Sequence, residues 1–126
     1  MSFRSDIDRF MKNDVDGGML KKVTEIEKYV YKELVSRAAV GTENGGAFRA
    51  NMNRDKGAPS GKFDKNKTSS IQGRSPVDDP YATYYVSNSA PYAMRLEYGW
   101  NGKPWTLKQP LGLFNLVANA ASIKFK

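Results

Sequence analysis

Residues Tyr84–Gly99 read YYVSNSAPYAMRLEYG, and this stretch decides the fold that the sequence predicts. Apolar and polar side chains alternate over residues 82–87, as they do along a half-buried strand. Pro91 stands where a helix begins well, because the first helical residues need no N–H donor, and Gly99 can adopt the left-handed conformation that ends a helix. The stretch therefore predicts a strand over 82–87, followed by a short helix over 90–98.

The short helix is expected to belong to the hydrophobic core. Tyr92 and Leu96 are four residues apart and share one helical face. Asn88 or Ser89 can accept a hydrogen bond from a free backbone N–H of the turn that follows. Because the stretch is the densest apolar segment of the chain, we expect the core here, with Tyr92 and Leu96 packed against the strand 82–87.

A long N-terminal helix is predicted, with an interruption. Apolar residues recur every three or four positions over 3–11 and again over 20–39. Between these segments stand Gly17 and Gly18, which cost about 1 kcal/mol each inside a helix and therefore predict a kink or a break. An apolar stripe of this length needs a sheet or a neighbouring subunit to cover it. The stripe consists of Phe3, Ile7, Phe10, Met11, Leu20, Val23, Ile26, Val30 and Leu34.

The middle of the chain predicts a second strand and a long loop. Apolar and polar residues alternate over 48–53, after a pair of glycines. Residues 55–79 have little periodicity and few apolar side chains, so we expect a long basic loop between two strands that, if it orders, orders against other subunits. Its last residues, Asp78-Asp79-Pro80, read as a turn that leads into the strand.

A C-terminal helix is expected over 112–122. Ile123 and Phe125 alternate with lysines, so the final residues would also suit a strand. Together these elements predict an α+β fold in a single domain over 1–126. In this fold the long N-terminal helix packs on a small antiparallel sheet, and the short and C-terminal helices complete the core.

The composition excludes several classes of function. The chain has no cysteine and no histidine, which removes disulfides, thiol nucleophiles, the commonest general base and the commonest zinc ligand. No apolar run approaches the length of a membrane span, and acidic residues interrupt the N-terminus where a secretory signal needs an apolar run. No residues form a catalytic pattern, so we expect no enzyme, no cofactor, no metal and no membrane partner.

The net charge of +7 is unevenly distributed. Residues 48–74 carry seven basic and two acidic side chains. A surface of this kind can contact nucleic acid or an acidic partner protein, but we favour the simpler explanation of a soluble, well-hydrated loop. The basic residues that we take as candidates for partner contact are Arg49, Arg54, Lys56, Lys62, Lys65, Lys67 and Arg95.

The stretch that decides the fold also resembles the signature of the small head–tail joining proteins of long-tailed bacteriophages, also called tail-completion, neck or minor tail proteins. Their pattern is a strand ending in Ser/Thr-Asn, then a few residues, Pro-Tyr-Ala, a basic residue, a hydrophobic residue and Glu-Tyr-Gly. Residues 87–99 read SNSAPYAMRLEYG. Residues 109–112, Gln-Pro-Leu-Gly, match a second element, whereas residues 38–46 lack the Pro and Asp that the family has after its first helix. The residues that match the main motif are Asn88, Pro91, Tyr92, Ala93, Leu96, Glu97, Tyr98 and Gly99.

The resemblance implies a structural role in a virus particle. The protein would be a subunit of a ring, with a hexamer favoured, at the phage neck or the head-proximal end of the tail, where it joins head to tail. Its partners would be further copies of itself, adjacent neck or connector proteins, tail terminator or tail tube proteins, and the genome DNA that passes through the lumen. It would be a virion component assembled in the host bacterial cytoplasm, and the isolated chain would be monomeric or weakly associated.

The basic loop would have a defined partner in such a ring. DNA must move through the channel, and several phosphate contacts per subunit would hold it back. We therefore expect the loop lysines to contact acidic surfaces of adjacent neck or tail proteins rather than DNA. These lysines are Lys56, Lys62, Lys65 and Lys67.

The alternative function is a small basic module that binds nucleic acid. Residues 48–74 would then contact phosphates, and Tyr84 and Tyr85 would stack on bases. The chain has no named nucleic-acid-binding motif. A salt titration separates the two functions, because affinity for nucleic acid falls steeply with salt.

Overall fold

The computed structural model describes residues 17–38, 46–67, 74–99 and 112–126. The predicted apolar positions from Phe3 to Met11 lie outside these residues, as do Gln109 to Leu111. The described residues form an α+β fold with a long helix, a two-stranded antiparallel sheet, short helices and a C-terminal helix, as predicted. The elements are α2 (Gly17–Arg37), α3 (Ala47–Ala50), β1 (Asn53–Lys56), β2 (Tyr84–Ser87), α4 (Ala93–Tyr98) and α5 (Leu113–Lys124).

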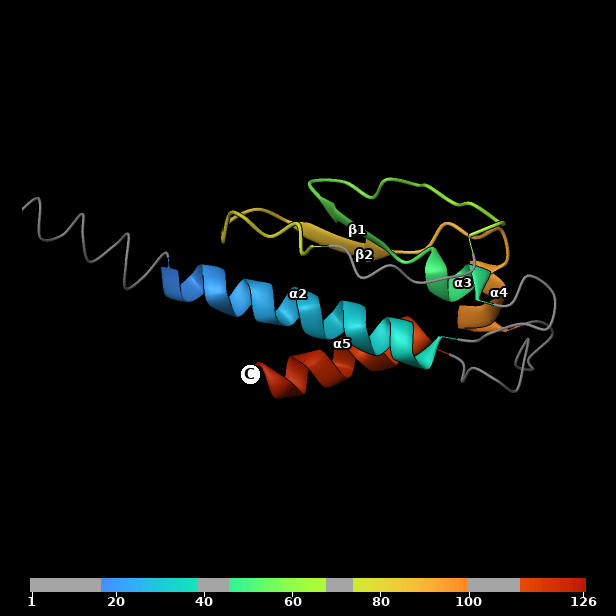
Figure 1. The fold of residues 1–126 in the computed structure, drawn as a ribbon. Coiled ribbons are helices and arrows are strands. Elements are labelled where there is room, and N and C mark those ends of the chain that lie inside the picture. The colour runs from blue at the N-terminus through green and yellow to red at the C-terminus, as the bar shows by residue number, and fades with distance from the viewer. Residues whose placement is uncertain (1–16, 39–45, 68–73, 100–111) are drawn as a thin grey trace, which may run out of the picture.

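Helix α2 lies between the small sheet and α5 (Figure 1). Strands β1 and β2 pair antiparallel, with Asn53 opposite Ser87. The backbone N–H of Gly57 donates to the carbonyl of Thr83 at 2.9 Å and extends the pairing beyond the strands. Because an isolated two-stranded sheet is marginally stable at best, this sheet depends on the helix beside it.

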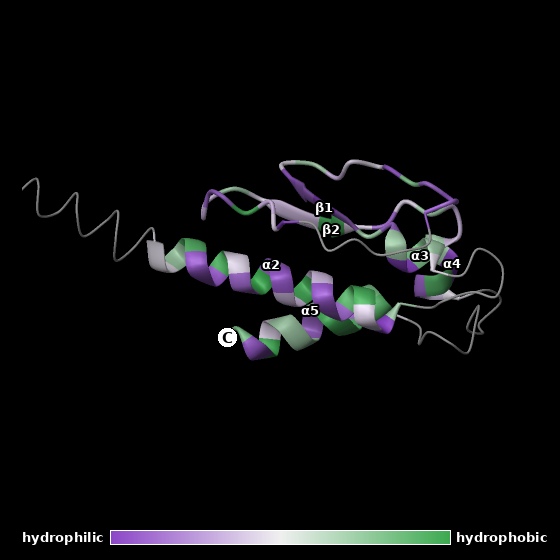
Figure 2. Ribbon diagram, in the orientation of Figure 1, coloured by the Kyte–Doolittle hydropathy of each residue, from purple (hydrophilic) through white to green (hydrophobic). Residues whose placement is uncertain are grey.

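Apolar and polar residues alternate along α2 with the period of a helix (Figure 2). Tyr31 and Leu34 are buried, and the exposed positions carry lysines and Glu25. The helix predicted over 20–39 is therefore confirmed, with its end at Arg37. Gly17 and Gly18 are the first residues of α2, so the segment before the predicted kink lies outside the described residues.

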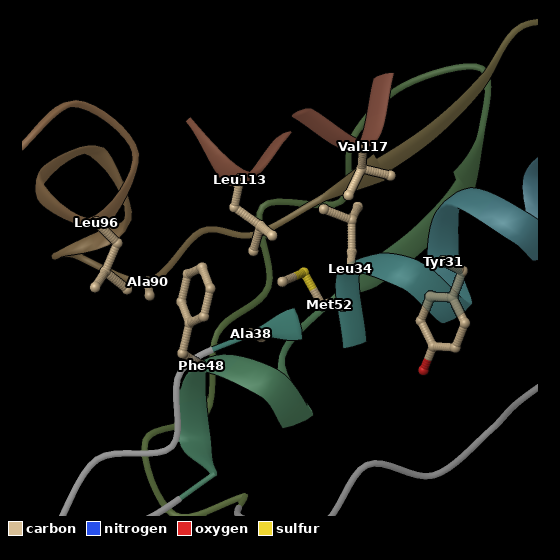
Figure 3. Close-up of a cluster of buried hydrophobic side chains, with 9 residues drawn as sticks. All are labelled: Tyr31, Leu34, Ala38, Phe48, Met52, Ala90, Leu96, Leu113 and Val117. Carbon is tan, nitrogen blue, oxygen red and sulfur yellow. The ribbon is translucent and has the colours of Figure 1, made fainter. Parts of the chain in front are cut away.

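The hydrophobic core forms where α2, α3, α4 and α5 meet (Figure 3). Leu34 of α2 meets Leu113 and Val117 of α5, and at most 1% of the surface of each of the three is exposed. The stretch Tyr84–Gly99 contributes only Ala90 and Leu96 to the buried residues of the core. The expectation that the core lies in this stretch is therefore only partly confirmed, since Val86, Tyr92 and Ala93 pack against the core from its edge. The centre of the core is the contact between α2 and α5.

The strand predicted over 48–53 is wrong. Half of this range, residues 48–50, belongs to α3, and β1 begins only at Asn53. Gly46 leads into α3 with φ at +94°, in the left-handed region that favours glycine. The adjacent Ala47 and Phe48 are both buried, which a strand with one solvated face does not allow.

Asn51 explains why the chain turns here instead of extending. Its side-chain Nδ2 donates to the carbonyl of Ala47 at 2.7 Å and to the carbonyl of Asp64 at 2.9 Å, and its Oδ1 accepts from the N–H of Asp64 at 2.8 Å. The buried amide thus closes α3 and ties it to the loop after β1. Because Asp64 is distant in sequence, the local alternation cannot reveal this constraint.

Helix α4 is shorter than the predicted 90–98, because its first residues form a turn. The Oδ1 of Asn88 accepts the N–H of Ala90 at 3.0 Å, and Pro91 lies in the turn before the helix rather than at its first position. Gly99 ends the helix with φ at +79° and ψ at −170°. Its φ is positive, as predicted, but its ψ lies outside the left-handed helical region.

Tyr92 packs elsewhere than expected. Its ring centroid lies 6.1 Å from that of Phe48 and 6.2 Å from that of Phe63. Its ring partners thus come from α3 and the loop after β1, while Val86 of the predicted strand packs against the same core cluster. Leu96 is buried in the core cluster with Phe48 and Leu113. These neighbours are distant in sequence, which is why periodicity alone assigned the wrong ones.

Helix α5 continues to Lys124, so the strand alternative for the last residues is wrong. Ile123 is helical and 77% exposed. The ring of Phe125 meets that of Tyr29 edge-on, with the centroids 5.5 Å apart. This contact holds the end of α5 against α2.

The connection between the strands is partly built onto the domain. Asp55 and Lys56, which the sequence assigned to the loop, belong to β1. Within residues 57–67, Phe63 packs against the edge of the core, and the Nδ2 of Asn53 donates to the carbonyl of Lys62 at 2.8 Å. The expectation that the loop orders against other subunits is therefore wrong for these residues.

The turn predicted at Asp78-Asp79-Pro80 is confirmed. The Oδ1 of Asp79 accepts the N–H of Tyr81 at 2.9 Å. The hydroxyl of Tyr84 donates to the carbonyl of Asp79 at 2.7 Å and accepts the N–H of Asp79 at 3.0 Å. The turn is thus fastened to the first residue of β2.

The role of α4 in the core gives a prediction for stability. Leu96→Ala should lower the free energy of unfolding by about 2–5 kcal/mol, because Leu96 is only 5% exposed and truncation leaves a cavity. Met94→Ala on the same helix is the control. Met94 is 68% exposed, so its truncation should change stability by no more than about 0.5 kcal/mol. Denaturant unfolding measures both, and equal losses would remove Leu96 from the core.

Candidate functional site

A buried ion pair joins the sheet to the long helix. Arg54 of β1 donates through its Nε to the Oε2 of Glu27 on α2 at 2.8 Å, and its Nη2 donates to Oε1. The side chains are 10% and 4% exposed. The guanidinium carbon also lies 4.2 Å from the ring centroid of Tyr31, within the range of a cation–π contact. Arg54, a candidate for partner contact, therefore serves the fold.

A basic groove of about 820 Å³ opens beside this pair. Lys28 and Lys32 line it from α2, and Arg74 lines it from the segment before β2. All three are exposed, and the hydroxyls of Thr24 and Ser75 also line the groove. The three cations suit an anionic group, whereas the hydroxyl of Thr24 already donates to the carbonyl of Leu20 at 2.7 Å. The sequence signal was the i, i+4 spacing of Lys28 and Lys32, which places like charges side by side.

An apolar groove of about 590 Å³ runs between α2, β2 and α5. Val23 and Val30 of α2, Val86 of β2, and Phe114 and Ala118 of α5 line it. The sequence predicted the apolar stripe of α2, but not that α5 covers only part of it.

Two further basic candidates are also engaged within the domain. Arg49 donates to the carbonyl of Ala38 at 3.2 Å. Lys56 donates to the Oδ1 of Asp78 at 2.7 Å, across the base of the hairpin. Lys62, Lys65 and Lys67 are exposed on the loop after β1, and Arg95 is exposed on α4. The structure thus separates loop lysines that face solvent from basic residues that hold the fold.

The hydrogen bond between Lys56 and Asp78 shifts the pKa of both side chains. The hydrogen bond to Asp78 raises the pKa of Lys56, and the hydrogen bond from Lys56 lowers the pKa of Asp78. A lowered carboxyl pKa stabilises the fold above the ordinary pKa of the group, and this contribution is lost as the pH falls through the lowered value. Because the pair is exposed, solvent screens it and its contribution is small.

Some residues of the predicted motif bind or pack within the domain, and others are exposed on its surface. Asn88 donates from Nδ2 to the carbonyl of Phe48 at 2.7 Å and so ties β2 to α3. Leu96 lies in the core. Tyr98 is 70% exposed, and Met94, one helical turn before it, is 68% exposed. Pro91 is exposed, and Tyr92, Ala93, Glu97 and Gly99 are half-buried.

Glu97 has a structural role that the sequence did not reveal. Its Oε2 accepts the N–H of Phe114 at 3.0 Å, and its Oε1 accepts the N–H of Asn115 at 3.3 Å. Its carbonyl also accepts the N–H of Gly112 at 2.8 Å. A carboxylate is favoured at a helix N-terminus, where N–H groups lack partners, and Gly112 offers no side chain to cap α5. Glu97 therefore fastens α4 to the start of α5.

The described residues contain no group of three or more acidic side chains that could hold a metal ion. Among the helices in this part of the chain, none has both the length and the apolar character needed to cross a bilayer. The chain matches no protein-family model, no curated protein and no solved structure. The resemblance over residues 87–99 therefore stays a prediction from sequence.

The cap on α5 can be tested by substitution. Glu97→Ala should lower the free energy of unfolding by about 0.5–2 kcal/mol, the usual cost of losing a helix cap. Glu33→Ala is the control, because Glu33 forms an exposed i, i+4 pair with Arg37 that is worth at most about 0.5 kcal/mol. Thermal or denaturant unfolding of both variants gives the comparison. A control that loses as much as Glu97→Ala would contradict the cap.

The buried ion pair gives a second prediction for this region. Arg54→Ala should cost about 3–5 kcal/mol, because it leaves the Glu27 carboxylate buried without its partner. A double variant, Glu27→Leu with Arg54→Met, should recover much of that loss, since apolar residues of similar volume often replace a buried pair. Denaturant unfolding of the single and double variants measures this coupling. A double variant as unstable as Arg54→Ala would show that the ion pair itself stabilises the fold, because Leu and Met restore apolar packing and leave no unpaired charge.

Proposed function

We propose that this chain is a structural, non-enzymatic virion protein, a subunit of a ring that joins head to tail in a long-tailed bacteriophage. The ring lies at the neck or the head-proximal end of the tail. The order of the motif over 87–99, between a long helix and a C-terminal helix, supports this proposal. The proposed partners are further copies of the chain, neighbouring neck or connector proteins, and tail terminator or tail tube proteins, with the genome DNA passing through the lumen.

The observation that carries the proposal is that some residues of the motif hold the domain together while others are exposed. Asn88, Leu96 and Glu97 hold β2, α3, α4 and α5 together, whereas Tyr98 is largely exposed. Met94 lies one turn away from Tyr98 and is exposed as well. Exposed tyrosine and methionine are typical of the surfaces where proteins meet. In the proposed ring this face of α4 contacts a neighbouring protein.

The loop lysines support a contact with acidic protein surfaces. Lys62, Lys65 and Lys67 are exposed on one short loop, and the hydrogen bonds of Asn51 and Asn53 hold this loop against the domain. A fixed positive surface suits a fixed acidic partner, which makes a joint specific for one neighbour. Lys56 takes less part in this contact, because Asp78 binds it.

A second candidate function is nucleic-acid binding, and the basic groove favours it. Lys28, Lys32 and Arg74 place three cations along one groove, where they could follow a phosphate backbone. Of the two tyrosines proposed to stack on bases, Tyr85 is 37% exposed, but the hydroxyl of Tyr84 is held by Asp79. Binding to single-stranded DNA that weakens steeply with rising salt, and is lost in Lys28→Ser/Lys32→Ser, would favour this function.

The proposed function is tested in the phage that encodes the chain. Mass spectrometry of purified particles should find the protein in the virion, and a phage without it should yield separate heads and tails. Replacing Lys62, Lys65 and Lys67 with Ser should leave the fold intact and lower the yield of joined particles, since exposed charges contribute little to stability.

The matched control replaces Lys21, Lys22 and Lys126 with Ser, which removes three exposed lysines outside the loop. It should leave joining unchanged. Normal joining with altered genome retention or ejection in the loop variant would mean that the loop faces DNA. Joined particles in the complete absence of the protein would overturn the proposed function.

A further inference from the structure

Three cations that line the basic groove make no ion pair with the described residues. These cations are Lys28 and Lys32 of α2 and Arg74 of the segment before β2, and all three are exposed. The ion pairs in the described part of the chain are Arg37 with Glu33, Arg54 with Glu27, and Lys56 with Asp78. The charges of the three groove cations are therefore available to a partner.

Helix α2 places two of these cations where they repel each other. Lys28 and Lys32 are four residues apart, and like charges at this spacing destabilise a helix. Glu25 stands three residues before Lys28 but forms no ion pair with it. Further along the helix, Glu33 and Arg37 have the same spacing, but opposite charges, and they pair at 2.8 Å. An anion in the groove would offset the repulsion between Lys28 and Lys32.

Nothing acidic balances these charges inside the groove. Of the described residues that line it, four are basic and none is acidic. Arg54 is the fourth basic residue, and its charge is already neutralised, because both carboxylate oxygens of Glu27 bind it. The other three charges leave the groove positive, and a concave surface with charges of one sign concentrates ligands of the opposite sign.

The groove lacks the aromatic surface that single-stranded DNA needs. Proteins that bind single strands combine a basic groove with exposed aromatic side chains on which the bases stack. Tyr31 is the aromatic residue among the described residues that line the groove, and it is only 7% exposed. The guanidinium carbon of Arg54 lies 4.2 Å from its ring centroid, so a base cannot stack there. An acidic protein segment needs no such surface, because its carboxylates bind the cations directly.

The positions of the cations favour carboxylates at a regular spacing. Lys28 and Lys32 are about 6 Å apart along the helix axis, since each residue advances the helix by about 1.5 Å. In an extended chain, alternate side chains point the same way and lie about 6.6–6.8 Å apart. Arg74 adds a third contact, and its guanidinium can bind one carboxylate through two parallel hydrogen bonds.

We propose that the basic groove binds an extended acidic segment of another protein, whose carboxylates on alternate residues pair with Lys28, Lys32 and Arg74. This assignment depends on the charges of the groove and not on the proposed function. That the segment belongs to a neighbouring neck or tail protein is a further step, which rests on the proposed function. In the joint, the groove would then supply a contact separate from that of Lys62, Lys65 and Lys67.

Titration of the full chain with a peptide tests the groove directly. The probe is a short peptide of alternating glutamate and serine, and the reference peptide has glutamine in place of each glutamate. At an ionic strength of about 0.1 M the Debye length is about 10 Å, so charges far from the groove contribute little. The acidic peptide should bind about tenfold more tightly than the reference. Lys28→Ser/Lys32→Ser and Arg74→Gln should each weaken its binding about tenfold.

The matched control is Lys21→Ser/Lys22→Ser, which removes two exposed lysines of α2 that do not line the groove. It changes the net charge as much as Lys28→Ser/Lys32→Ser does, but it should leave peptide binding almost unchanged. Thermal unfolding shows whether each variant is folded. Because Arg74 lies outside the helix, Arg74→Gln tests the groove even if the helix variant unfolds.

Two results of the titration would overturn the inference. Equal binding of the glutamate and glutamine peptides, or equal weakening by the groove and control variants, would mean that the three cations are merely hydrated. A single-stranded oligothymidine that binds more tightly than the acidic peptide, and is lost in Lys28→Ser/Lys32→Ser, would assign the groove to nucleic acid.

Cross-linking of purified particles tests the identity of the partner. A carbodiimide joins amines to carboxylates without a spacer, so it should link Lys28 or Lys32 to an acidic segment of a neighbouring protein, identified by mass spectrometry. Particles that contain the protein but show no such link would overturn this partner. If the protein is in virions but the acidic peptide does not bind, only the groove assignment is wrong. If the peptide binds but virions lack the protein, the groove assignment holds and the proposed function is wrong.

Discussion

The packing of Leu34 against Leu113 and Val117 is the contact on which the rest of the structure depends. It joins the long helix to the last helix and is the most completely buried apolar contact in the described residues. Two strands of four residues cannot form a stable sheet alone, so the sheet needs a helix that is itself fixed. Helix α2 meets that need, because α5 holds one of its sides while Arg54 fastens the sheet through Glu27.

The elements that the sequence predicted correctly are those in which local periodicity and burial agree. The stripe of α2, the alternation along β2 and the apolar face of α5 each predict one side turned toward the protein. The structure buries part of that side in α2 and α5, and half-buries it in β2. The strand predicted over 48–53 is wrong because the alternation of apolar and polar residues there does not reflect a strand with one buried face. The side chain of Asn51 binds Asp64 across the loop, and this distant partner outweighs the local pattern.

The roles of charged residues could not be predicted, because the sequence does not show whether a charged side chain points into the domain or into solvent. Arg49 and Arg54 were taken as candidates for partner contact, yet both bind groups of their own domain. Glu97 was part of a predicted motif, but its cap on α5 becomes visible only once the two helices are placed. One signal was available for the buried pair: Glu27 interrupts the apolar stripe of α2, and a carboxylate on a buried face requires a cation.

The dependence of the core on α5 has a consequence for how the protein is made. Contacts between residues far apart in sequence form late, because the chain between them must first be brought to order. Synthesis at roughly 5–20 residues per second leaves α2 without α5 for several seconds after α2 leaves the ribosome. During that interval the apolar stripe around Leu34 is open to any apolar surface nearby. Chaperones can therefore bind the nascent chain during this interval. When many copies are synthesised at once, the exposed stripe also favours aggregation before α5 has been synthesised.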